Sequence, residues 1–213
     1  MWPELEKTEE LLEQAREGDS AAVEDLIMRH RDALRQLVRM RMDRQIQRRV
    51  DVSDIVQEVL IEANRRLQDY LANPSMPFHL WVRHIARDRI IDAHRRHRVS
   101  AKRSVDREQA MVVPGGMDRS SIVLAGQLMD GGKSPSAVSL EREMVRQVET
   151  AITRLEEMDA EVIVMRHYEQ LTNGEIAHAL GLTEPAASMR YLRAIRRLRE
   201  LMQTPDHSAT GER

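Results

Sequence analysis

The stretch that decides the fold is LTNGEIAHALGLTEPAASMRYLRAIRRLREL, residues 171–201, which predicts two short helices joined by a tight turn. Thr172 and Glu175 have the T-x-x-E spacing of a capping box at the start of the first helix. Gly181 follows that helix at the position where a left-handed residue commonly ends one. Thr183 is then placed to cap a second helix, so the pattern favours a helix-turn-helix.

The second helix of this pair has two distinct faces. Four residues recur at steps of four, three and four and are expected to face inward: Ala187, Tyr191, Ala194 and Leu198. Six residues near its start are expected to face outward: Glu184, Pro185, Ser188, Met189, Arg190 and Arg193. In a DNA-binding helix-turn-helix, side chains at such positions meet base edges or phosphates. The alternative is a helical hairpin that packs on a partner, which the row of arginines from Arg190 to Arg199 disfavours.

The composition favours an all-α protein. Of 213 residues, 41% are apolar and 32% are charged, while only 3% are aromatic, a balance typical of helical proteins with aliphatic cores. The chain has no cysteine, which excludes a disulfide framework and thiolate metal sites. We find no run of about eighteen apolar residues and no signal-like N-terminus, so we expect no membrane span, no secretion and a cytoplasmic location.

A glycine-rich segment divides the chain. Five of the nine glycines fall between residues 114 and 132, with prolines and serines around them. We therefore predict two small helical domains, residues 1–100 and 137–203, joined by a flexible linker, residues 101–136, and followed by a disordered tail, residues 204–213. As a flexible coil of about 40 residues, the linker would span roughly 30–40 Å.

Residues 78–98, FHLWVRHIARDRIIDAHRRHR, predict an amphipathic helix. One side gathers the apolar residues Phe78, Trp81, Val82, Ile85, Ala86 and Ala93. Another side gathers the basic residues Arg83, Arg87, His94 and Arg98. Arg89 and Asp92 point toward the apolar side three residues apart, so we expect them to pair with each other or with a neighbouring helix. The sequence leaves open whether Trp81 only packs in the core or also stacks on a base.

The preceding stretch, DVSDIVQEVLIEANRRL at residues 51–67, predicts another helix. Asp51 is expected to cap it, and Asp54 lies in the first turn, where the helix dipole favours a carboxylate. The expected buried residues are Ile55, Val59, Ala63 and Leu67. The acidic residues Asp51, Asp54, Glu58 and Glu62 have no base among them. A loop is predicted from Asp69 to Pro77 because it contains Asn and two prolines.

The chain as a whole resembles the bacterial RNA polymerase sigma factors of the extracytoplasmic-function group. Three motifs carry the resemblance, in the family's order: DVSDIVQEVLIEA (51–63), FHLWVRHIARDRIIDAHRR (78–96) and MDAEVIVMRHYEQLTNGEIAHALGL (158–182). They are similar to the family's polymerase-binding helix, its promoter-melting helix and the start of its second domain. The resemblance covers most of the sequence.

This resemblance implies a factor that binds core RNA polymerase and directs promoter recognition, DNA melting and transcription initiation. The clamp helices of the largest subunit are implied to dock on Asp54, Gln57 and Glu58. The loop from Asp69 to Pro77 corresponds to one that captures a flipped base of the minus-ten element, and the implied minus-ten contacts are Asn73, Arg83, Arg87, Arg95 and Arg96. The second helix of the helix-turn-helix corresponds to the one that recognises the minus-thirty-five element, through Glu184, Pro185, Ser188, Met189, Arg190 and Arg193.

Other partners and several absences are also implied. The flap of the second-largest polymerase subunit and promoter DNA are expected partners, and control is expected from an anti-sigma factor or from the long linker. Sigma factors have no catalytic residues, so we expect no enzymatic activity, no cofactor, no metal ion and no small-molecule substrate.

Three alternatives compete with this interpretation. A free-standing helix-turn-helix repressor or activator with a helical effector domain would explain the C-terminal part alone. An enzyme would need a metal cluster from His84, Asp88, Asp92 and His94, which the angles around a helix disfavour because His94 lies on the opposite flank. An inhibitor or adaptor that binds polymerase without recognising DNA would leave the helix-turn-helix unused.

Overall fold

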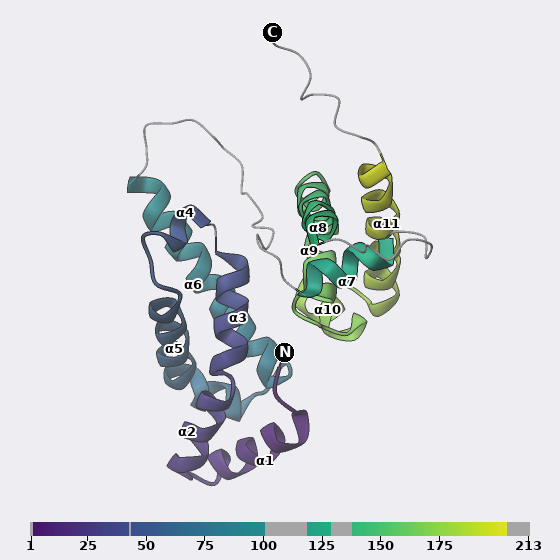
Figure 1. The fold of residues 1–213 in the computed structure, drawn as a ribbon. Helices are drawn as coiled ribbons and strands as arrows, with labels where there is room; N and C mark the ends of the chain where they lie inside the picture. The colour runs from purple at the N-terminus through teal and green to yellow at the C-terminus, as the bar shows by residue number, and fades with distance from the viewer. Residues whose placement is uncertain (1, 43, 101–118, 129–137, 204–213) are drawn as a thin grey trace. The chain divides into compact units, whose positions relative to one another are not determined.

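The computed structural model describes residues 2–42, 44–100, 119–128 and 138–203 (Figure 1). These described residues form helices and connecting loops, with no strand among them, so the all-α prediction is confirmed. The chain divides into two compact units, Met1–Ala110 and Met111–Arg213.

The first unit contains a bundle in which long helices lie side by side. Its elements are α1 (Leu5–Arg16), α2 (Ser20–Arg29), α3 (Arg31–Arg41), α4 (Arg44–Gln47), α5 (Val52–Ala72) and α6 (Phe78–Ser100). Helices α3, α5 and α6 pack against one another and supply most of the core (Figure 1). Asp51 caps α5 by accepting a hydrogen bond from the Ser53 backbone N–H at 2.7 Å, as predicted. The four residues expected to be buried on α5, which are Ile55, Val59, Ala63 and Leu67, are at most 2% exposed.

The connection between α5 and α6 is shorter than the sequence predicts. Helix α5 continues to Ala72, so the loop is residues 73–77 rather than 69–77. Tyr70 and Leu71 are buried, and their burial extends the apolar face of α5 by another turn. The helix ends at Asn73, where the following Pro74 disfavours helical backbone.

The second unit contains the predicted helix-turn-helix. Its elements are α7 (Arg119–Leu128), α8 (Val138–Thr153), α9 (Glu157–His167), α10 (Asn173–Leu180) and α11 (Glu184–Gln203). The capping box of Thr172 and Glu175 is formed at the start of α10, and Gly181 ends that helix with a left-handed φ of 65°. Thr183 accepts a hydrogen bond from the Ala186 N–H at 3.3 Å and so caps α11. The prediction of this motif is confirmed at each of its capping positions.

Helix α7 corrects the prediction of one continuous flexible linker. It lies inside residues 101–136 but packs on α8 and α9 as part of the second unit. Ser121, Leu124 and Ala125 are almost completely buried, and the Ser121 hydroxyl is 3.0 Å from the Tyr168 hydroxyl. The rest of the predicted linker and the predicted disordered tail, residues 204–213, lie outside the described residues.

Candidate nucleic-acid and protein interfaces

The outer face of α5 combines acidic and apolar side chains. Asp54 and Gln57 are exposed near the start of the helix. Glu58 is partly exposed and pairs with Arg96 of α6, with 3.1 Å between Oε2 and Nη2. Ile61, one turn further, is 63% exposed, so a large apolar side chain continues this stripe. We did not predict Ile61 as a site residue, although its i+3 and i+4 spacing from Glu58 and Gln57 was the signal that could have identified it.

Glu62 occupies the flank of α5 that faces α6 and joins the two helices. Its side chain is 8% exposed, and its carboxylate accepts a hydrogen bond from Arg65 at 2.7 Å. It also forms ion pairs with Arg66 and with Arg89, whose Nη2 lies 3.2 Å from Oε2. The hydrogen bond from Arg65, opposed by desolvation and supported by Arg66, lowers the pKa of Glu62 to about 2. The carboxylate therefore stays charged at neutral pH and holds three guanidinium groups.

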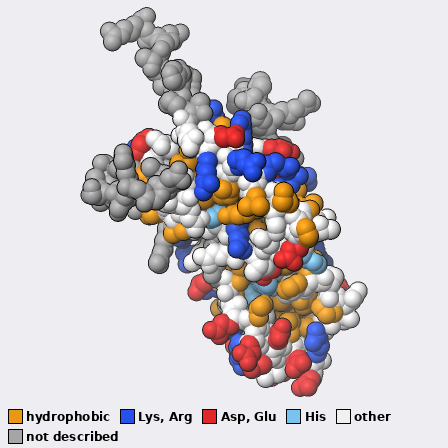
Figure 2. All heavy atoms as spheres, turned by 90° about the vertical axis from the view of Figure 1, so that its right-hand side faces the viewer, with side chains coloured by type: hydrophobic (Ala, Val, Ile, Leu, Met, Phe, Trp, Pro, Cys, Tyr) orange, Lys and Arg blue, Asp and Glu red, His pale blue; other side chains and the backbone are white. Residues whose placement is uncertain are grey.

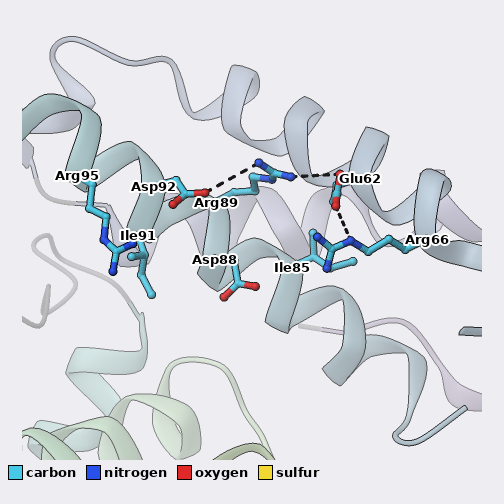
Figure 3. A pocket seen from close by; sticks show the side chains of 8 residues that line it. All are labelled: Glu62, Arg66, Ile85, Asp88, Arg89, Ile91, Asp92 and Arg95. Carbon is cyan, nitrogen blue, oxygen red and sulfur yellow. Dashed lines mark ion pairs between the residues drawn. The ribbon is translucent and has the colours of Figure 1, made fainter. Parts of the chain in front are cut away.

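Arg89 also approaches Asp92 at 4.0 Å, so its predicted pairing with Asp92 or with a neighbouring helix is confirmed for both partners. Figure 3 shows Arg89 between Glu62 and Asp92. These three residues line a hollow of about 480 Å³. Asp88, Ile91 and Arg95 also line this hollow (Figure 3). Since acids and bases alternate around the hollow, it carries no surplus charge that would select a small anion.

The cationic face of α6 is narrower than the sequence predicts. Arg87 and Arg95 are exposed, and Arg96 is exposed while paired with Glu58. Arg83 is only 2% exposed, so its predicted place on the outward basic face is wrong. Helix α6 packs against both α3 and α5, so its buried arc extends past the apolar residues to position 83. At this exposure the guanidinium is buried together with the aliphatic stem.

Aromatic side chains hold the loop between α5 and α6. The Tyr70 ring lies 4.7 Å from the Trp81 ring and 5.5 Å from the Phe78 ring. The Tyr70 hydroxyl donates to the Met76 carbonyl at 2.8 Å and so fixes the loop end. Phe78 is buried, whereas Trp81 is partly exposed at the edge of this cluster, and Asn73 is exposed in the loop.

On α11, the inward face is as predicted at three of four positions. Ala187, Ala194 and Leu198 are at most 1% exposed. Tyr191 is partly exposed, and its hydroxyl lies 3.0 Å from Nε2 of His167 on α9. Burial lowers the pKa of His167 to about 4, so the ring that contacts Tyr191 is neutral at physiological pH.

The outward face of α11 differs from the prediction at two positions. Glu184, Pro185, Met189 and Arg193 are exposed as expected. Arg190 is only partly exposed, since 24% of its side chain is accessible and its Nη1 donates to Oδ1 of the buried Asp159 on α9 at 2.9 Å. The Ser188 hydroxyl accepts from the side-chain amide of Asn173 on α10 at 3.0 Å.

Two residues farther along α11 join this surface without having been predicted as site residues. Leu192 is 55% exposed, and Arg196 is exposed one turn beyond it. Helical spacing was the available signal, since positions 185, 189, 192 and 196 share one face. The described residues include no group of three or more acidic or histidine side chains arranged to hold a metal ion. Across the described helices, none combines the length and apolarity needed to span a bilayer.

Comparison with known proteins identifies the family. The family model described as ECF sigma factor matches residues 5–203. The chain is 27% identical over 192 residues to the RNA polymerase sigma factor CnrH of Cupriavidus metallidurans, which covers 90% of this chain and 92% of CnrH. It is 28% identical over 201 residues to the RNA polymerase sigma factor NccH of Alcaligenes xylosoxydans xylosoxydans, which covers 92% of this chain and 95% of NccH.

A solved structure agrees with this assignment at the level of fold. CnrH in complex with the cytosolic domain of CnrY matches with a TM-score of 0.55 and 23% identity, over 92% of this chain and 97% of that one. The family model spans both helical units, from the first turn of α1 to the end of the DNA-binding motif. The protein therefore belongs to the extracytoplasmic-function (ECF) family of RNA polymerase sigma factors.

Proposed function

We propose that this sigma factor directs core RNA polymerase to promoters with two elements, and that its first unit opens the minus-ten element while its second unit recognises the minus-thirty-five element. The observation that carries this proposal is the helix-turn-helix of α10 and α11, with an exposed face on α11, in a chain that matches the family over both units. Sigma factors regulate transcription without an active site of their own, so the polymerase supplies the chemistry.

The outer face of α5 is the proposed dock for the polymerase's largest subunit. Asp54, Gln57 and Glu58 supply its polar part, and Ile61, one turn further along α5, adds an exposed apolar residue. Interfaces commonly combine an apolar centre with a polar rim. The clamp helices are the proposed partner, and a basic surface there would complement Asp54 and Glu58. We propose the flap of the second-largest subunit as the partner of the second unit.

The loop at residues 73–77 and the start of α6 form the proposed minus-ten site. Asn73 is exposed in the loop, and Trp81, in the first turn of α6, is partly exposed. Extruding a base costs a few kcal/mol, so a preformed pocket favours sequences that it can hold. Stacking on an aromatic ring contributes about 1–3 kcal/mol per base. Arg87 and Arg95 on the exposed side of α6 are placed to attract the phosphates of a separated strand.

Control by an anti-sigma factor is part of this proposal. The related CnrH has been solved in complex with the cytosolic domain of CnrY. A partner that covers the outer face of α5 here would compete directly with polymerase, because both would bury Asp54 and Ile61.

Transcription in vitro tests the proposal. Purified protein is added to sigma-free bacterial core polymerase with fragmented genomic DNA, and transcript starts are mapped by sequencing. We expect discrete starts that share two upstream motifs and disappear when the protein is omitted. Stable binding to core polymerase without starts would contradict the initiation role and indicate an inhibitor. Absence of both binding and starts would favour a free-standing helix-turn-helix regulator.

A further inference from the structure

An apolar stripe runs along the first three turns of the exposed face of α11. Pro185, Met189 and Leu192 follow one another at steps of four and three, which places them in one stripe. Met189 is 66% exposed and Leu192 is 55% exposed. Large apolar side chains at this exposure on a helix expected to contact a ligand require an explanation.

Two of the polar side chains beside this stripe have partners within the unit. The Ser188 hydroxyl is held by Asn173 of α10, and Arg190 is held by Asp159 of α9. Both residues were predicted to contact the minus-thirty-five element. Beside these two engaged side chains, Met189 and Leu192 remain exposed.

Basic side chains on the same helix favour duplex DNA as the ligand of this apolar stripe. Arg193 is 61% exposed beside Met189, and Arg196 is exposed one turn beyond Leu192. Figure 2, which faces the side of Figure 1 where α11 lies, shows basic side chains beside hydrophobic ones on the second unit. Arginines around an apolar centre suit a ligand that presents phosphates around an apolar group.

The major groove has one such group, the C5-methyl of thymine. We propose that Met189 and Leu192 contact thymine methyl groups in the minus-thirty-five element and so select thymine by apolar contact. This inference rests on the proposed function and adds the base that the second unit selects. Burial of one methyl group corresponds to about a fourfold change in affinity.

The experiment compares thymine with uracil, which pairs identically but lacks the methyl group. Holoenzyme made from core polymerase and the full chain first selects its upstream element from a library of random DNA duplexes. Each thymine in the selected element is then replaced singly by deoxyuridine, and holoenzyme affinity for the duplexes is measured by competition. We expect about a fourfold loss at one or more thymines with the native chain.

Variants assign the effect to the two side chains. Met189→Ala and Leu192→Ala should each remove the difference between thymine and uracil at one position, while Met189→Leu should retain it. Both native side chains are exposed, so the folded state should persist, which far-UV circular dichroism checks. Val123→Ala is the matched control, because Val123 is 49% exposed on α7 of the same unit. The salt dependence of binding should not change, since no phosphate contact is removed.

The outcomes separate the two proposals. Thymine-specific losses that disappear in Met189→Ala or Leu192→Ala support methyl contact. A selected element that tolerates uracil at every position overturns methyl contact and leaves the sigma function standing, as does an equal loss in native and variant proteins. Failure of the holoenzyme to select any discrete element overturns the proposed recognition of promoters and this inference with it.

Discussion

Replacing Arg190 by alanine should destabilise the second unit rather than remove a DNA contact. The Asp159 side chain is 9% exposed, so water cannot readily replace a lost partner. Arg190 Nη1 lies 2.9 Å from Asp159 Oδ1, whereas Arg193 Nη2 lies 3.5 Å from the same oxygen and belongs to a side chain that is 61% exposed. Loss of the shorter charge-assisted hydrogen bond should cost about 1.5–3 kcal/mol, and loss of the longer, exposed contact less than about 1 kcal/mol.

Hydrogen exchange is the suitable assay for this comparison. Both tryptophans, Trp2 and Trp81, lie in the first unit, so tryptophan fluorescence does not report on the second. Mass spectrometry of the full chain can follow the amides of α9, α10 and α11 instead. A loss of about 2 kcal/mol corresponds to roughly 30-fold faster exchange of the most protected amides. Arg190→Ala should approach that value, and Arg193→Ala should stay below about fivefold.

Two further measurements decide whether loss of the ion pair with Asp159 causes the destabilisation expected in Arg190→Ala. In a double-mutant cycle of Asp159→Asn and Arg190→Ala, the combined loss should be smaller than the sum of the single losses. In holoenzyme binding to promoter duplexes, Arg193→Ala should make the negative slope of log affinity against log salt shallower by about 0.9, and Arg190→Ala should leave it unchanged. Equal exchange rates in Arg190→Ala and Arg193→Ala would refute the structural role assigned to Arg190. A shallower salt dependence of DNA binding in Arg190→Ala would refute it as well.

The other predictions concern the first unit. Reversing the charge of Asp54 and Glu58 to arginine should weaken binding to core polymerase by about tenfold or more, since like charges would then oppose a basic partner. The same reversal of Glu9 and Glu13, which are exposed on α1, should leave polymerase binding unchanged in the same titration. Because the pKa of Glu62 is lowered from 4.5 to about 2, its charge contributes stability above pH 4.5 that is lost as pH falls toward 2. In Glu62→Gln, tryptophan fluorescence should therefore show acid unfolding with a weaker pH dependence in that window, and an unchanged dependence would contradict this.

The sequence predicts best those features that local chemistry determines. Thr172, Glu175 and Gly181 lie within ten residues of one another, and their capping bonds need no distant partner. Helix α5 is similar, because its buried residues recur with the helical period. Helix α7 could not be predicted this way, since glycines and prolines surround a short segment whose burial depends on α8 and α9.

Features determined by distant partners are those that the sequence misses. Arg190 and Asp159 are 31 residues apart, and only the packing of α11 on α9 brings them together. Arg83 is misplaced for a related reason: a helical wheel with one apolar arc cannot show that α6 contacts two other helices. The exposed apolar residues Ile61 and Leu192 were overlooked because an apolar residue in a helix is more often buried than presented to a partner.

The two proposed recognition helices share an arrangement that separates folding from binding. On α5, Glu62 fixes the flank against α6 while Ile61, its neighbour in sequence, faces outward. On α11, Arg190 fixes the flank against α9 while Met189, also its neighbour, faces outward. In each helix, a partly buried ion pair joins the element to its neighbour, and the side chain at the adjacent position is mostly exposed. Substitutions at the outward positions can therefore change the partner or the preferred base with little cost in stability, because the orientation of the helix does not depend on them.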